Sequence, residues 1–159
     1  MAQRDEFSPL RKSLDLTVPP ATAFRIWTEE LGRWWPLARH SVGAADALTC
    51  ALESNVGGRI FETTRAGARH LWGTISAFEP SHRLAHSWHP GRDPAAATSI
   101  ELTFRPRAGG GSRLVLVHDG WRPASAARRA DYDCGWDALL RDHYGAWVAA
   151  VAAGTIASA

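Results

Sequence analysis

The stretch "TSIELTFRPRAGGGSRLVLVHD", residues 98–119, decides the fold. Apolar and polar residues alternate on both sides of a glycine-rich turn, and Ile100, Leu102 and Phe104 share one face of the first half. This period of two predicts a β-hairpin with one buried face.

Further strands precede this hairpin. From Thr49 onward the sequence divides into short segments bounded by turn residues such as "NVGG" and "EPS". Turns this short join antiparallel neighbours, because parallel strands need crossovers of a dozen or more residues. We expect strands at residues 49–54, 59–64, 70–78, 82–88, 98–106 and 112–119.

Helical patterns flank these strands. The segment "KSLDLTV", residues 12–18, predicts a first strand, and the spacing of Phe24, Trp27 and Leu31 predicts a short helix after it. Beyond Pro123 the period changes to that of a long amphipathic C-terminal helix. Its expected apolar stripe contains Tyr132, Trp136, Leu139, Leu140, His143, Trp147 and Val151.

Together these elements predict an α+β fold with a seven-stranded antiparallel sheet. The apolar face of such a sheet must be covered, and the C-terminal helix is the one element long enough to cover it. A twisted sheet that curls around a helix leaves space where the two diverge. We therefore expect a small-molecule cavity between the sheet and this helix.

The length and composition of the chain argue against several classes of function. A chain of 159 residues is most simply one domain, and its net charge of +2 comes without a continuous basic stripe, which argues against nucleic-acid binding. The apolar runs are too short to span a bilayer, and the N-terminus lacks a secretory signal, so we expect a cytoplasmic protein. Cys50 and Cys134 are expected to be reduced, buried thiols.

Several motifs resemble one protein family. They are "VPPATAFRIWTEELGRWWP", "VGGRIFE", "WGTISAFEPSHRLAHSWHP", "IELTFRPRAGGGSRLVLVHDGW" and "GWDALL". Their order is similar to that of the START-like, or SRPBCC, superfamily, in the branch named for activators of the heat-shock-protein ATPase. The resemblance covers about residues 13–151 of a single domain spanning 1–159. It implies the helix-grip fold: a curved antiparallel sheet around a long C-terminal helix, with two short N-terminal helices.

Two histidines are candidates for a polar role in the cavity. Strand parity carries His86 inward between Leu84 and Trp88, and it carries His118 inward after Leu116. Each imidazole is expected either to meet a ligand oxygen or to be satisfied by protein groups. His82, His86 and His89 cannot meet one metal ion on a regular strand, so we predict no metal site here. The inward or outward direction of Glu62 stays open, because Ile60 and Phe61 are both apolar.

Tryptophan is the most unusual residue in the composition, with eight copies. Trp34 and Trp35 lie side by side after the short helix, and we expect them to divide their roles, with Trp35 on the cavity side. An exposed apolar patch around Trp34 would equally suit a homodimer contact. The expected ligand-binding residues are Trp35, His86, Trp88, His118, Trp121, Trp136 and Leu140.

Three functions follow as alternatives. The first is non-catalytic binding of a small apolar or aromatic molecule in the cavity. The resemblance implies the other two: a co-chaperone that interacts with a heat-shock-protein ATPase, and an enzyme of the polyketide cyclase or aromatase type. No nucleophile triad, phosphate loop or carboxylate pair stands out, so we predict no catalytic residue and no cofactor.

Overall fold

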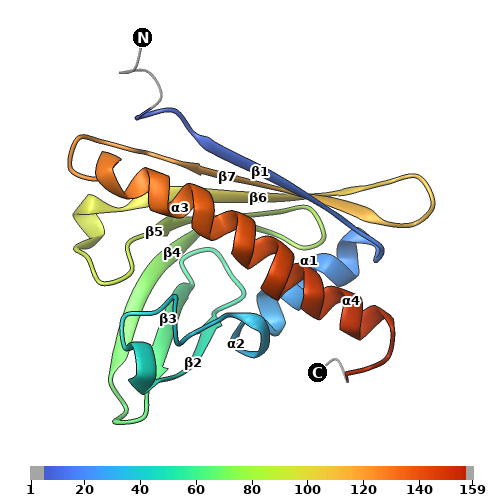
Figure 1. Cartoon of the computed structure of the whole chain (residues 1–159), viewed down its shortest axis with the longest axis horizontal. Coiled ribbons are helices and arrows are strands. Elements are labelled where there is room, and N and C mark those ends of the chain that lie inside the picture. Colours follow the sequence, from blue (N-terminus) through green and yellow to red (C-terminus); the bar gives the residue numbers. More distant parts are fainter. Residues whose placement is uncertain (1–5, 157–159) are drawn as a thin grey trace.

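The computed structural model describes residues 6–156 and confirms the helix-grip fold. Seven strands, two short helices and a long C-terminal helix follow the expected order (Figure 1). The strands are β1 (Leu10–Leu16), β2 (Ala47–Leu52), β3 (Arg59–Thr64), β4 (Arg69–Glu79), β5 (Arg83–Trp88), β6 (Thr98–Pro106) and β7 (Ser112–Asp119). The helices are α1 (Pro20–Glu29), α2 (Leu31–Trp34), α3 (Ala126–Ala138) and α4 (Ala146–Ala152), with 3-10 turns at Ala44–Asp46 and Pro94–Ala96.

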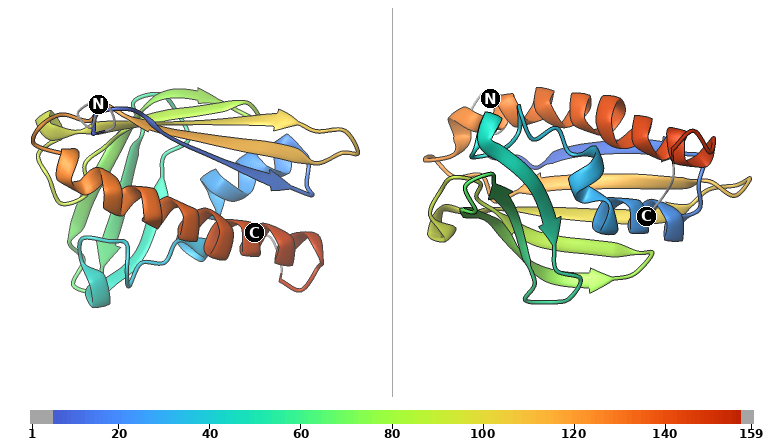
Figure 2. Two further views of the ribbon diagram at one scale, coloured as in Figure 1. Left: turned by 45° about the horizontal axis from the view of Figure 1, so that its top comes forward. Right: turned by 90° about the horizontal axis from the view of Figure 1, so that it is seen from below.

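The strands form one antiparallel sheet in the order β1-β7-β6-β5-β4-β3-β2. Each strand from β2 to β7 pairs with its sequence neighbour, and β1 closes the other edge against β7. The sheet curls so that β2 and β3 bend toward the side on which the long helix lies (Figure 2). This curl produces the expected groove between sheet and helix.

The alternation of apolar and polar residues in β6 and β7 matches an alternation of buried and more exposed side chains in these strands. In β6 and β7 the register pairs Leu102 with Leu116 and Phe104 with Leu114, and all four side chains are buried. Burial of each such side chain contributes roughly 1.5–3 kcal/mol relative to exposure. The short helix α1 packs on this row, with the ring of Phe24 5.3 Å from the ring of Phe104.

The C-terminal helix is continuous from Ala126 to Ala152 but changes type within its length. Residues Leu139–Gly145 are π-helical, between α3 and α4. A π-helix takes more residues per turn than an α-helix, so it shifts the buried stripe. His143, expected on the stripe, is half-buried, whereas Tyr144 is fully buried in its place.

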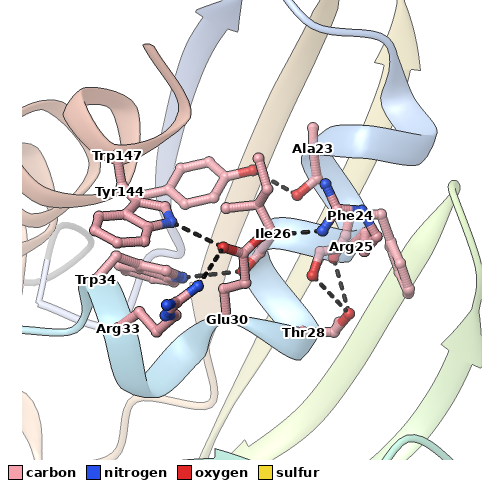
Figure 3. Close-up of polar contacts among 10 residues, drawn as sticks. All are labelled: Ala23, Phe24, Arg25, Ile26, Thr28, Glu30, Arg33, Trp34, Tyr144 and Trp147. Carbon is pink, nitrogen blue, oxygen red and sulfur yellow. Dashed lines mark hydrogen bonds and ion pairs between the residues drawn. The ribbon is translucent and has the colours of Figure 1, made fainter. Parts of the chain in front are cut away.

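The short N-terminal helices are joined to the long helix by buried polar groups (Figure 3). The Tyr144 hydroxyl donates to the carbonyl oxygen of Ala23 over 2.7 Å. The indole of Trp147 donates to the buried Glu30 carboxylate over 3.3 Å, and Arg33 lies 3.8 Å from the same carboxylate. These contacts hold α1 and α2 against one half of the helix, which leaves its other half to form the groove.

Two expectations about single residues were wrong. Trp34 is buried, with its ring against Trp27 and Tyr144, so it forms no exposed apolar patch. Its indole also donates to the carbonyl oxygen of Ile26, inside the protein. Cys134 is exposed, because it lies on the side of α3 away from the sheet.

Candidate functional site

A pocket of about 380 Å³ lies at one end of the groove. Three segments enclose it: the first part of the long helix, the loop that follows α2, and the chain just after β5. Side chains almost fill the part of the groove between Trp27, Trp72 and His86, where the void holds about 10 Å³. The expected cavity therefore exists, but at the end of the groove and not along its whole length.

The helix presents one regular face to the pocket. Its lining residues are three or four positions apart, which places them on one side of an α-helix. Gly135 lies in the middle of this face, and a Cβ atom built on it would meet nothing closer than Cε1 of His40 at 3.9 Å. The absence of a side chain at Gly135 thus leaves space in the pocket. No close approach of another backbone segment requires a glycine here. The residues of this face are Arg128, Asp131, Tyr132, Gly135, Trp136 and Leu139.

Three tryptophans from three different elements form the apolar walls. The ring centroids of Trp35 and Trp88 are 5.8 Å apart, and each lies 6.2 Å from the ring of Trp136. All three rings are tilted or perpendicular to one another, as aromatic pairs prefer. Trp35 comes from the end of α2, Trp88 from the end of β5 and Trp136 from the long helix. The pocket thus forms where these three ends meet.

Each of these indoles has its N–H satisfied within the protein. Trp35 donates to the carbonyl oxygen of His40 over 2.7 Å, and Trp88 donates to the hydroxyl of Tyr132 over 3.2 Å. Trp136 donates to Nδ1 of His118 over 3.0 Å. The rings therefore offer carbon surface to the pocket, and their orientations are fixed by hydrogen bonds.

His118 is the centre of a buried chain of hydrogen bonds. Because an indole N–H can only donate, Nδ1 of His118 must accept from Trp136, and the imidazole proton then lies on Nε2. Nε2 donates to the hydroxyl of Thr98 over 2.7 Å, and that hydroxyl donates to the carbonyl oxygen of Trp88 over 3.2 Å. Burial, together with the nearby His86, lowers the pKa of His118 to about 3. The neutral imidazole thus links two walls of the pocket.

His86 lies deeper, in the core and outside the lining of the large pocket. Its Nδ1 is 2.8 Å from the carbonyl oxygen of Ser87. Burial lowers the pKa of His86 to about 4. This imidazole is neutral at physiological pH and contributes to packing against Trp88.

Glu62 points inward and holds the loop that forms one pocket wall. Its carboxylate is fully buried and accepts hydrogen bonds from the backbone N–H groups of Val42 (2.5 Å) and Gly43 (2.9 Å) and from the indole of Trp72 (2.7 Å). Phe61 takes the outer face, with the guanidinium of Arg69 over its ring at 4.8 Å. A buried carboxylate with three N–H donors is a strong anchor.

The mouth of the pocket carries polar side chains. Arg39 and His40 come from the loop, and Arg128 and Asp131 come from the helix. Partial burial, with smaller effects of His143 and Arg39, lowers the pKa of His40, so its imidazole is neutral at pH 7. Burial raises the pKa of Tyr132, so its phenol keeps its proton.

The structure places the seven expected ligand-binding residues in two groups. Trp35, Trp88 and Trp136 line the pocket. His118 and Trp121 lie behind this wall, with their ring centroids 4.4 Å apart. His86 and Leu140 are buried in the core, and Leu139 lines the pocket in place of Leu140.

Several lining residues were not among the expected ligand-binding residues. Tyr132 and Leu139 were expected on the inner stripe of the helix, and Arg128 could have been added to the site, because its spacing from Trp136 is that of the same helical face. The loop residues carried no such signal, since their position depends on the distant anchor Glu62.

A curved sheet around one long helix, with an aromatic pocket at the end of the groove, defines a helix-grip protein. The sequence matches the family model described as Activator of Hsp90 ATPase homolog 1-like protein over residues 17–143. The chain belongs to this family, within the START-like, or SRPBCC, superfamily, as the motifs predicted. A comparison with curated proteins found no match.

Solved structures share the fold. A protein from Rhodobacter sphaeroides is 24% identical, with a TM-score of 0.67 over 92% of this chain and 93% of that chain. The Aha1 dimer from Colwellia psychrerythraea, solved in solution, is 13% identical, with a TM-score of 0.61 over 86% and 92%. The anthrahydroquino-gamma-pyrone synthase Txn09, solved with a ligand, is 31% identical, with a TM-score of 0.53 over 72% and 78%. Within residues 6–156, no helix is long and apolar enough to cross a membrane.

Proposed function

We propose that the protein binds a small, flat aromatic molecule in the pocket lined by Trp35, Trp88 and Trp136. One observation carries the proposal: three indole rings line an unfilled volume of about 380 Å³, and their N–H groups are all bonded elsewhere. Pockets for small molecules commonly enclose roughly 300–1,000 Å³ and are lined by apolar and aromatic groups. Such walls favour a ligand that offers a π-face or a ring edge.

The similarity to Txn09 supports the same ligand class. Its description as an anthrahydroquino-gamma-pyrone synthase names a fused aromatic product. A chain 31% identical to that protein, with an aromatic pocket, is well suited to a fused-ring ligand. Gly135 supports the proposal further, because a glycine within a helix costs about 1 kcal/mol relative to alanine and here leaves space for a ligand.

A substitution that fills the pocket tests the proposal. In Gly135→Leu the new side chain would occupy the space beside His40, while the helix would gain up to about 1 kcal/mol from the better propensity of leucine. We expect the wild type to bind naphthalene-2-carboxamide, measured by isothermal titration calorimetry. We expect Gly135→Leu to lose at least about tenfold in affinity while remaining folded.

The matched control is Ala130→Leu, an exposed position on the same helix outside the pocket. This variant carries the same new side chain and should bind the carboxamide as the wild type does. Equal affinity of Gly135→Leu and the wild type would contradict the proposal, and so would the absence of binding to the wild type.

A second candidate is ring closure of an aromatic polyketide, the enzyme alternative that the family resemblance implies, and the description of Txn09 as an anthrahydroquino-gamma-pyrone synthase supports it. His40 favours it, because a neutral imidazole at the pocket mouth can accept a proton at pH 7. Incubation with a partly cyclised aromatic polyketide, followed by mass and absorbance measurements, would test for turnover. If His40 acts as the base, His40→Ala should abolish product formation and change substrate affinity much less.

A heat-shock-protein partner, a homodimer and a cytoplasmic location stay predictions. The family name supports the first, and the dimeric Aha1 neighbour supports the second. Adding the protein to the cognate heat-shock ATPase tests the first, because a pure ligand binder should leave the ATPase rate unchanged. Light scattering across a concentration series tests the second.

A further inference from the structure

We propose that the aromatic ligand carries an acidic group, such as a carboxylate, that Arg39 and Arg128 bind at the mouth of the pocket. This inference rests on the proposed function, because it specifies the chemistry of the ligand in the same pocket. It is carried by the arginines that line the pocket and by their lack of partners.

Arg39 and Arg128 reach the pocket from two different walls. Arg39 belongs to the loop after α2, and Arg128 belongs to the first turn of α3. Within residues 6–156 neither guanidinium forms an ion pair or a side-chain hydrogen bond. Some other arginines have such partners: Arg59 pairs with Glu53, and Arg113 pairs with Asp15, each over 2.7 Å. Two unpaired guanidiniums therefore line the same pocket as the aromatic rings.

The charge at the mouth is positive. Among the described residues that line the pocket, Asp131 is the one acid, and it forms no ion pair with Arg128 although the two are three positions apart on the helix. His40 is neutral at pH 7. Two guanidiniums thus outnumber one carboxylate, and a guanidinium stays protonated at any physiological pH. A ligand anion would find a net attraction at this mouth.

Tyr132 supplies a neutral donor beside these charges. Its hydroxyl oxygen accepts from Trp88, and its own proton has no acceptor among residues 6–156. Tyr132 follows Arg128 by one helical turn, so both project from the same face of α3. A carboxylate can accept from a guanidinium through both oxygens and from a phenol at the same time. The donors therefore match an oxygen-bearing anion better than a cation or a neutral amine.

Two probes of the same shape separate charge from aromatic binding. Naphthalene-2-carboxylate and naphthalene-2-carboxamide have the same ring system and differ in charge. Because Arg39 is exposed and Arg128 is half-buried, we expect a moderate preference, with the carboxylate bound about three- to tenfold tighter by the wild type. The carboxylate affinity should fall as salt is raised, and the carboxamide affinity should not.

The double variant Arg39→Gln/Arg128→Gln tests the residues themselves. In calorimetric titrations its carboxylate affinity should drop to that of the carboxamide. Arg65→Gln/Arg105→Gln is the matched control, because both arginines are exposed and lie outside the pocket, and their loss removes the same two positive charges. That variant should keep the full preference.

The outcomes are distinguishable. If the carboxamide binds and the carboxylate binds no tighter, the acidic group is refuted and the aromatic pocket stands. A preference that persists in Arg39→Gln/Arg128→Gln, or that disappears in Arg65→Gln/Arg105→Gln, also refutes the role of Arg39 and Arg128. If neither probe binds, the proposed function and this inference both fail.

Discussion

The indole nitrogen of Trp136 donates a hydrogen bond to Nδ1 of His118 across 3.0 Å, and both side chains are buried. This contact fixes the tautomer of the imidazole and, through Thr98, connects the wall formed by Trp136 to the backbone of Trp88. The strand β7 thereby positions two of the aromatic rings of the pocket, although His118 itself lies behind them. A residue expected to touch the ligand instead orients two residues that line the pocket.

Removing the imidazole should destabilise the fold. In His118→Phe the Trp136 N–H would lose its acceptor and the Thr98 hydroxyl would lose a donor, both in a buried setting. An unsatisfied buried polar group costs about 1–3 kcal/mol, so we expect a loss of about 2–4 kcal/mol in the free energy of unfolding. Urea denaturation, followed by circular dichroism, measures it.

A double-mutant cycle assigns this loss to the named contact. In a Trp136→Phe background the indole donor is absent, so His118→Phe should cost about 1–2 kcal/mol less than in the wild type. Trp147→Phe serves as the control, because that indole bonds to Glu30 instead. Additive losses for His118 and Trp136 would show that their hydrogen bond contributes little.

The buried histidines should make the fold sensitive to mild acid. The folded pKa values of about 4 for His86 and about 3 for His118 lie below the unfolded value of about 6.5. As the pH falls below 6.5 the unfolded state takes up protons that the folded state does not, so stability is lost on acidification. Between pH 7 and pH 5 we expect the free energy of unfolding to fall by about 3–4 kcal/mol.

Denaturation curves at a series of pH values check this expectation. The window from pH 7 to pH 5 lies above the range in which most carboxylates titrate, so the histidines dominate it. The variant His118→Phe keeps His86, the other buried imidazole whose pKa is strongly lowered, and should lose only about half as much stability over the same window. A variant with the slope of the wild type would exclude His118 as a source of the pH dependence.

The anchor of the pocket loop offers a separate test. In Glu62→Gln an amide nitrogen would face one of the N–H donors of Val42, Gly43 or Trp72, so at least one buried donor would lose its acceptor. We expect a loss of about 1–3 kcal/mol in unfolding free energy. Amide hydrogen exchange in residues 37–44 should accelerate, and affinity for naphthalene-2-carboxamide should fall.

Glu53→Gln is the control for that substitution. Glu53 is exposed and pairs with Arg59 at the surface, so its replacement should leave both exchange in the loop and ligand affinity as in the wild type. If Glu62→Gln behaves like Glu53→Gln, the loop is held by other contacts.

The sheet was predictable because its pattern is local. The alternation in β6 and β7 predicted the bounds of both strands, Thr98–Pro106 and Ser112–Asp119, to the residue, and the short turns allow only antiparallel pairing.

The helix was less predictable in its detail. Its π-helical segment displaces His143 from the core and buries Tyr144, whose hydroxyl bonds to Ala23, 121 positions away in the sequence. The spacing of residues along the helix does not predict the hydrogen bond between Tyr144 and Ala23.

For the site, the sequence predicts only which side chains of a strand or helix point inward. The alternation along β7 placed His118 inward but could not show that Trp136 and Thr98 would occupy both of its nitrogens. The direction of Glu62 was undecided because two apolar residues precede it. Its partners, Trp72 and the loop at Val42, are brought to it by tertiary structure.

The indole N–H signals of the eight tryptophans test the central claim most directly. In a ¹H–¹⁵N correlation spectrum, titration with naphthalene-2-carboxylate should shift the signals of Trp35, Trp88 and Trp136, which line the pocket. The signals of Trp34 and Trp147, which are bonded to Ile26 and Glu30, should stay in place. Equal shifts of all of these signals, or shifts confined to Trp34 and Trp147, would contradict an aromatic ligand in this pocket.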